Sequence, residues 1–581
     1  MLRVAERSRL SKALLQRSLR QLASRVAHPL ARWRLIPSRT DRLVIAPQDL
    51  RTTDATRAGE IYAGRFVFAG KIVVCDNRSP FEMAPASDEW VRALLGFGWL
   101  RHLRAADSGI ARANSRALIE EWIRLQGRRH PLAWRIDILS RRIISWLSQA
   151  PMILTDADLL FYRRFLRSLS KQVRVLRRRI ADAPDGTVRL QALIALTMAS
   201  LCMAGQTGHL RATLRRLIDE LDRQILPDGG HISRNPQALV ELLLDLLPLR
   251  QVLANRNVAP PQPMLNAIER MMPMLRFFRH GDGSFGHFNG VGPTAPELVA
   301  TVLAYDDARG APVANAAHSG YQRLEAGRSI ILMDTGKPPP VNVSSEAHAG
   351  CLSFELSNGL RRIVVNCGLP ATNREAWRSV ARATAAHSTV VFNDVSSCRF
   401  LESGSFKRLF GGSPIVAGPN NVTVMREETP DGTMLRASHD GYAERFGAIH
   451  QRTLMLTKDG NHLEGEDVFT SSVGDQLPRE DEFAIRFHLH PTVRATLLSD
   501  GHGAMLMLPD RDVWNFNAYE DVVDLEESVY LAGAEGPRRT TQIVIYGKGR
   551  RAPRVRWSFT HRPPAPGEQQ TANDEQPWLP L

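Results

Sequence analysis

The spacing of apolar residues changes once along the chain, near Gly320. From about Ser87 to Arg309, segments such as DEWVRALLGFGWLRHLRAA and QALVELLLDLLPLRQVLANR repeat apolar residues at i, i+3, i+4 and i+7, which predicts amphipathic helices. Past Gly320, segments such as RSIILMDTG, RRIVVNCG and STVVFNDVS alternate apolar with polar residues between turn signals, which predicts strands. Because helices are not interleaved with these strands, the pattern predicts a multidomain α then β fold, with helical hairpins followed by an antiparallel β-sandwich.

The length of 581 residues supports more than one domain, since single hydrophobic cores stop growing at roughly 250–300 residues. We expect a basic leader over 1–45, a helical domain over 46–315, a β-sandwich over 316–562 and a polar, Pro-rich, disordered tail over 563–581. The leader is either an amphipathic helix, with residues 1–35 resting on a membrane surface, or a poorly ordered segment. No apolar run is long enough to span a bilayer, and no signal-peptide pattern appears.

The net charge of +15 predicts attraction to polyanions, whether nucleic acid, anionic lipid or acidic polysaccharide. Only 7 of the 75 basic residues are Lys, so 75 − 7 = 68 are Arg, and they are spread along the whole sequence. A specific nucleic-acid interface is disfavoured because no binding motif is present and aromatic residues make up only 7% of the chain. Five scattered cysteines without a CxxC pair argue against a disulfide scaffold and a thiolate zinc site.

Polar residues gather at the ends of successive predicted strands early in the β half. His348 precedes the strand CLSFEL, Asn366 ends RIVVN, and Arg382 and His387 come before STVVF. Adjacent strands would bring these side chains to one edge of a sheet. Each histidine alone is explained by a half-buried, hydrogen-bonded role, but the group together is a candidate site.

Four separated segments resemble the heparinase II/III-like polysaccharide lyases. They are AWRIDILSRRIISWL, LPDGGHISRNPQALVELLLDLLPL, HAGCLSFELSNGLRRIVVNCG and ARATAAHSTVVF, and the resemblance runs from roughly Trp90 to His490. It implies an incomplete (α/α) toroid joined to an antiparallel β-sandwich, with a polysaccharide groove between them. It also implies β-elimination of a uronic-acid polymer, which needs a base, an acid and a group that neutralises the uronate carboxylate.

The resemblance also implies roles for individual residues. Asn235 would contact the uronate carboxylate, although it also suits a helix start before QALVELLLDLL, and His348 would be an acid–base or neutralising group. The family's tyrosine base is absent from FFRHGDGSFGHFNGVG, so His287 is the candidate replacement, while the nearest tyrosine, Tyr305, fits core packing. Residues expected to contact the polymer are His231, Arg234, Asn289, Arg382, Trp134 and Arg142.

Some members of the family hold a structural zinc in the β domain, at positions that match His348, Asn366 and His387. An amide oxygen at Asn366 is a weaker ligand than a carboxylate, so zinc affinity should fall. We expect no required cofactor, and a zinc here, if bound, would be structural.

The sequence therefore predicts a polysaccharide lyase acting on an acidic polysaccharide. The alternative is a non-catalytic acidic-polysaccharide-binding or exopolysaccharide assembly protein that has lost the proton-transferring tyrosine. The compartment stays open between periplasmic, by resemblance, and cytoplasmic, by the missing signal peptide.

Overall fold

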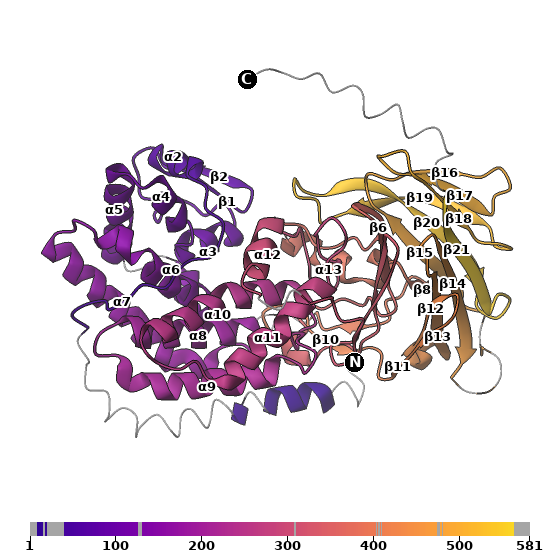
Figure 1. Cartoon of the computed structure of the whole chain (residues 1–581), viewed down its shortest axis with the longest axis horizontal. Coiled ribbons are helices and arrows are strands. Elements are labelled where there is room, and N and C mark those ends of the chain that lie inside the picture. Colours follow the sequence, from indigo (N-terminus) through magenta and orange to yellow (C-terminus); the bar gives the residue numbers. More distant parts are fainter. Residues whose placement is uncertain are drawn as a thin grey trace, which may run out of the picture.

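The computed structural model describes residues 8–15, 18–19, 40–125, 130–306, 310–372, 374–402, 404, 407, 410–472, 474, 477–478 and 480–562. A helical half and a β half lie side by side (Figure 1). The helices of the first half are α2 (Thr56–Tyr62), α3 (Asp88–Gly96), α4 (Leu100–Ala106), α5 (Gly109–Leu125), α6 (Ile136–Leu154), α7 (Leu159–Arg179), α8 (Thr187–Cys202), α9 (Leu210–Gln224), α10 (Gln237–Asn255), α11 (Gln262–Phe277) and α12 (Pro296–Leu303).

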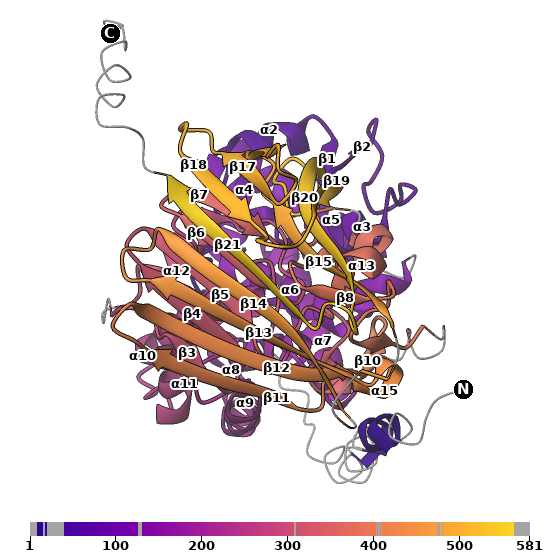
Figure 2. The same cartoon turned by 90° about the vertical axis from the view of Figure 1, so that its right-hand side faces the viewer.

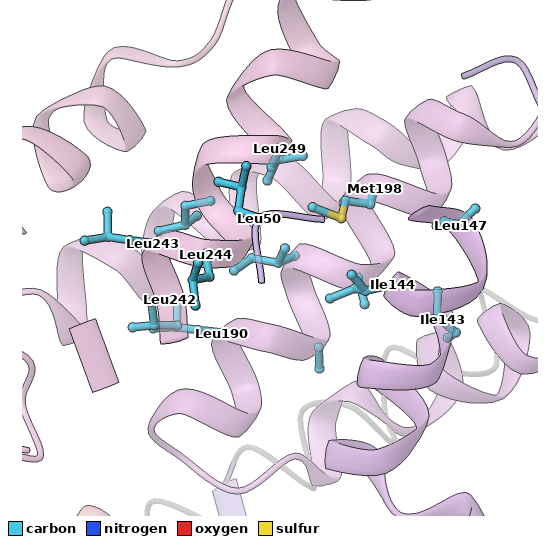
Figure 3. Packing of buried hydrophobic residues seen from close by; sticks show 14 of the residues in the cluster. Leu50, Ile143, Ile144, Leu147, Leu190, Met198, Leu242, Leu243, Leu244 and Leu249 are labelled. Carbon is cyan, nitrogen blue, oxygen red and sulfur yellow. The ribbon is translucent and has the colours of Figure 1, made fainter. Parts of the chain in front are cut away.

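Successive helices alternate between an inner and an outer layer. The inner helices α6, α8 and α10 contact one another in that order, while α7, α9 and α11 pack outside them. The inner helix α8 is apolar almost all round and is buried along most of its length, whereas α7 and α9 bury a single face. Ile143 and Leu147 of α6, Met198 of α8 and Leu243 of α10 point into the shared core (Figure 3).

The second half consists of two antiparallel sheets packed face to face. One sheet has the strand order β19-β20-β15-β7-β6-β5-β4-β3, with β8 paired to β15; the other has the order β11-β12-β13-β14-β21-β18-β17-β16. In Figure 2 the second of these sheets faces the viewer, and the helices lie behind the sandwich. Side chains from both sheets, among them Leu324, Ile331, Leu454 and Leu463, form one buried core.

The strands of the β half follow one another along the sequence in this order: β3 (Asn315–Ala316), β4 (Tyr321–Ala326), β5 (Ser329–Asp334), β6 (Phe354–Asn358), β7 (Arg361–Val365), β8 (Val390–Phe392), β9 (Arg399–Phe400), β10 (Ile415–Ala417), β11 (Val422–Glu428), β12 (Gly432–Tyr442), β13 (Ala448–Thr457), β14 (His462–Ser471), β15 (Glu482–Leu489), β16 (Arg494–Leu497), β17 (Gly503–Met507), β18 (Val513–Asn517), β19 (Val523–Tyr530), β20 (Arg538–Lys548) and β21 (Arg554–Arg562). Two short helices, α13 (Arg374–Arg382) and α15 (Ala443–Phe446), interrupt them.

The predicted change from helices to an antiparallel sandwich near Gly320 is confirmed. The helical half also holds a small hairpin, β1 (Arg65–Phe68) and β2 (Lys71–Val74), for which no prediction was made. Most of the predicted leader and the whole predicted tail over 563–581 lie outside the described residues. The exact domain limits stay predictions.

The two halves are joined by the segment LPDGGHISRN, which lies just before α10. Arg234 donates hydrogen bonds to the backbone oxygens of Ser319, Gly320, Gly336 and Lys337, and its guanidinium pairs at 2.5 Å with the carboxylate of Asp334 at the end of β5. Asp228 accepts a hydrogen bond of 2.6 Å from the backbone of Ser319. We call this set of contacts the Arg234 clamp.

The clamp leaves Arg234 without a nitrogen for a ligand, because all three guanidinium nitrogens donate within the protein. The side chain is also stacked over the ring of Tyr321, with its central carbon 4.7 Å from the ring centroid. Arg234 was expected to contact the polymer, but in this structure it has no free N–H group with which to do so. It instead joins the two halves.

Replacing Arg234 with Met should lower the free energy of unfolding by about 3–5 kcal/mol, because the Asp334 carboxylate would remain buried without its cation. Urea unfolding followed by tryptophan fluorescence measures this loss. Arg551→Met is the matched control: its ion pair with Glu480 lies on the surface, with Arg551 73% exposed, so it should cost less than about 1 kcal/mol. Equal losses in the two variants would contradict the role of the clamp.

Candidate functional site

A cleft with a cavity volume of about 840 Å³ opens where the helical half meets the β half. Its walls come from the β1–β2 hairpin, α3, α4, α6, α10 and α12 on one side, and from Thr372 and Ala534 of the β half on the other. The volume lies within the roughly 300–1,000 Å³ range of small-ligand pockets. Five arginines line it: Arg51, Arg57, Arg92, Arg101 and Arg141.

The carboxylates around the cleft hold most of these arginines in place. Arg51 and Arg141 share the buried carboxylate of Asp245 at 2.8 to 2.9 Å. Arg101 donates only to the backbone oxygens of Thr52 and Gly98, and no ion pair joins it to a carboxylate in the described part of the chain. Arginine forks fixed in this way can bind a carboxylate or sulfate with two parallel hydrogen bonds.

Glu241 is the one acidic residue among the described residues that line the cleft. It lies on α10, four residues from Asp245, and remains accessible to solvent inside the cavity. Burial within the cleft raises the pKa of Glu241, although the charges of Arg141, Arg51 and Arg374 act in the opposite direction. A raised pKa favours the protonated carboxyl group, which is the form that a general acid requires.

Next to the cleft, Gly290 brings together residues of both halves. A Cβ atom at Gly290 would lie 3.1 Å from Nδ2 of Asn235 and 3.1 Å from the backbone oxygen of Glu346, and its φ of 95° favours glycine. The preceding residue, Asn289, accepts a hydrogen bond of 3.0 Å from the backbone N–H of His348. The structure therefore places Asn235, Asn289 and the His348 segment in one neighbourhood, beside the cavity-lining Val291.

The hydrogen bonds of His387 determine the tautomer of His348. Nδ1 of His387 lies 2.8 Å from the carbonyl oxygen of Ala383, which can only accept, so this nitrogen carries the proton. Nε2 of His387 is then an acceptor, and Nδ1 of His348 donates to it at 2.9 Å. Burial lowers the pKa of His348 well below its usual range, and the charges of His387, Arg382 and Arg374 lower it further. His348 is therefore neutral, with a free lone pair on Nε2, which has no hydrogen-bond partner among the described residues.

The three residues predicted to hold a zinc ion are engaged in hydrogen bonds within the protein. The nitrogens of His348 and His387 that face each other share a hydrogen bond, and the side-chain oxygen of Asn366 accepts from the backbone of Ser388 at 2.9 Å. No group of three or more His, Cys, Asp and Glu side chains suited to a metal occurs in the described part of the chain. The zinc site at His348, Asn366 and His387 therefore stays a prediction, and no chemical step depends on it.

His287 lies in a separate buried network. Its backbone N–H donates to Glu355, which also pairs with Arg362 and His280. Arg362 donates to the His287 ring at 3.2 Å, and burial, with Arg362 next, lowers the pKa of His287 to about 3. Within the described part of the chain, the side chain of His287 contacts Arg362 and Glu355 and makes no hydrogen bond with Asn235 or His348. The role of His287 as a base therefore stays a prediction without geometric support.

Several residues expected to contact polymer are internal. Arg142 is fully buried and donates to Gln172 and to the backbone oxygens of Leu95 and Ala133. Its guanidinium lies 4.3 Å from the Trp122 ring centroid and 5.7 Å from that of Trp134.

Arg382 and His231 are likewise buried. Arg382 donates to the backbone oxygens of Ala347, Ser413 and Ser344. His231 is hydrogen-bonded to Ser233 and Gln224, and burial lowers its pKa to about 3. None of the residues predicted as site residues lines the cleft itself.

The cleft residues were missed by the sequence prediction. Arg51, Arg101 and Arg141 cannot be distinguished from the other arginines by spacing, because arginine is spread along the whole chain. Glu241 lies within an apolar helical run, VELLLDLL. An acidic residue within such an apolar run is a sequence signal that could have marked Glu241 as a candidate site residue.

The fold matches that of solved polysaccharide lyases. The crystal structure of Heparinase III superimposes with a TM-score of 0.67 over 85% of this chain and 79% of that protein, at 13% identity. A heparan sulfate lyase HepC mutant from Pedobacter heparinus gives a TM-score of 0.62 over 88% and 84%, at 14% identity. Likenesses at this level of identity establish the fold alone.

Sequence comparison extends the match to the family. The family model for the heparinase II/III-like C-terminal region covers residues 308–558. The FtsZ-localized protein C of Caulobacter vibrioides (strain NA1000 / CB15N) is 31% identical over 540 residues, which cover 91% of this chain and 92% of that protein. With a helical half and a β-sandwich arranged as in Heparinase III, this chain belongs to the heparinase II/III-like family.

Proposed function

We propose that this chain is a polysaccharide lyase that takes a uronic-acid-containing polymer into the cleft between its two halves and breaks it by β-elimination. The observation that carries the proposal is the pair His348–His387. Their fixed tautomers leave a neutral imidazole with a free lone pair on Nε2, which is the form that a general base requires.

The reaction divides between a carboxylate-binding part and a proton-transferring part. Nδ2 of Asn235 and the unpaired guanidinium of Arg101 can hold uronate carboxylates. A base takes the proton α to the carboxylate, the electron pair forms a carbon–carbon double bond, and the glycosidic C–O bond breaks. The departing oxygen then receives a proton from an acid.

In this proposal His348 is the base and Glu241, whose pKa is raised by burial, is the acid. Glu241 thereby occupies the role for which the family uses a tyrosine. Nε2 of His348 is out of contact with solvent in this structure, so the reaction requires the protein around it to move when polymer binds.

Asn235→Ala and His348→Ala should each lower kcat by roughly 10²- to 10⁴-fold. The measurement is the ultraviolet absorbance of the unsaturated sugar end released from glycosaminoglycans, alginates and bacterial exopolysaccharides. His462→Ala is the control, because His462 lies on β14 of the sheet that faces away from the helices, where its ring is hydrogen-bonded to Thr560.

The pH dependence is a second test. Since the pKa of His348 is held well below 6.5, activity should not decline between pH 7.5 and about 6, as it would for an ordinary histidine base.

Two results would count against the proposal in different ways. Polymer that binds to the wild-type chain but yields no unsaturated product would leave a non-catalytic acidic-polysaccharide-binding protein. No binding and no product across the whole panel would remove the polysaccharide as partner.

A second proposal is that the chain is localised together with FtsZ in its cell. It is supported by the 31% identity with a relative that is named for such localisation. The two proposals are compatible, because localisation can be carried by an outer surface while the cleft binds a polymer.

A fluorescent fusion of the full chain, expressed at its native level, should overlap with labelled FtsZ and disperse when FtsZ is depleted. The fluorescent protein alone serves as the control. A signal that stays in place without FtsZ, or that is uniform in its presence, would contradict this second proposal.

A further inference from the structure

Helix α7 carries the largest net charge of the described helices. Its 21 residues include eight basic side chains, Arg163, Arg164, Arg167, Lys171, Arg174, Arg177, Arg178 and Arg179, and no acidic one. The helix lies on the outside of the helical half, on the side away from the β half (Figure 1). It does not line the cleft.

Packing determines the direction in which these charges point. Phe161, Phe165, Leu169, Val173 and Leu176 are buried against the helical core. Opposite them lies a stripe made of Arg163, Arg164, Arg167, Lys171, Arg174 and Arg178, all of which are exposed. At 1.5 Å per residue the stripe extends over about 22 Å.

Little negative charge from the protein opposes this stripe. Arg164 pairs with Glu120 of α5, whereas Arg163, Arg167, Arg174 and Arg178 form no ion pair with any residue that the structure describes. Exposed like charges along one helix face are destabilising, and an external anionic partner would relieve their repulsion.

Two exposed leucines begin the same helix. Leu159 and Leu160 are 62% and 55% exposed. Asp158 caps this end of the helix by accepting hydrogen bonds from the backbone N–H groups of Leu160 and Phe161. Leu160 precedes Arg163 by three residues and Arg164 by four, so it lies on the stripe. Apolar side chains beside a row of arginines suit the boundary between lipid headgroups and acyl chains.

We propose that the α7 face, defined as Leu159, Leu160 and the six residues of the stripe, docks on a membrane surface that contains anionic lipid. Clusters of four to eight basic residues on an amphipathic helix are typical of such binding. The face belongs to a single helix and contributes no residue to the cleft. None of the described helices is both long and apolar enough to cross a bilayer.

The test is co-sedimentation of the full chain with vesicles of phosphatidylglycerol and phosphatidylethanolamine, compared with vesicles of phosphatidylcholine. The wild type should bind the anionic vesicles only, and high salt should weaken the binding. The triple variant Arg163→Glu, Arg167→Glu, Arg174→Glu should bind on the order of a hundredfold more weakly, at roughly 1 kcal/mol for each basic residue removed from the surface.

A matched control carries the same change of charge on the β half. Arg436, Arg494 and Arg538 are exposed residues of β12, β16 and β20, and their replacement with Glu should leave vesicle binding within about threefold of the wild type. Circular dichroism checks that both triple variants are folded.

Leu159→Ser together with Leu160→Ser keeps every charge and should weaken binding by about tenfold, because two apolar side chains no longer enter the lipid. Vesicle binding that persists in the α7 triple variant would overturn the proposal. Binding that the leucine variant retains in full would replace the lipid surface by a purely electrostatic polyanion as the partner.

Discussion

The ion pair between Arg234 and Asp334 is the contact on which the arrangement of the two halves depends. One guanidinium, supplied by the loop before α10, satisfies four backbone oxygens and one carboxylate of the β half. The loop that holds it continues directly into Asn235 and α10, whose side chains Gln237 and Glu241 line the cleft. The same segment therefore joins the halves and positions part of the cleft wall. A substitution in the clamp should consequently also shift the residues that line the cleft.

The second constraint on the site is that His348 is buried while one of its ring nitrogens, Nε2, has no hydrogen-bond partner among the described residues. A buried histidine is kept neutral because charging it in a low-dielectric environment is costly, and the carbonyl of Ala383 then determines which nitrogen of His387 and of His348 holds a proton. The surroundings of Glu241 also raise its pKa, against the opposing charges of Arg141, Arg51 and Arg374. The neutral state of His348 and the raised pKa of Glu241 thus both come from their surroundings and need no unusual residue type.

The sequence predicted the fold far better than it predicted the site. Hydrophobic period alone distinguished α3 from β13, because a helix buried on one side and a half-buried strand impose different spacings on the same apolar residues. It also placed His348 and His387 together, since both adjoin strands of one sheet. It could not separate Arg142 and Arg382, which satisfy internal carbonyls, from Arg101 and Arg141, which face the cleft. That difference depends on which long-range partners surround each guanidinium, and no local pattern encodes it.

The most direct measurement is a crystal structure of the chain with a uronate tetrasaccharide bound. The account predicts a sugar carboxylate within hydrogen-bond distance of Asn235, the hydrogen α to that carboxylate facing Nε2 of His348, and the rest of the sugar chain along Arg101 and Arg141. A tetrasaccharide found outside the cleft, or one inside it with His348 still sealed from the ligand, would contradict the account.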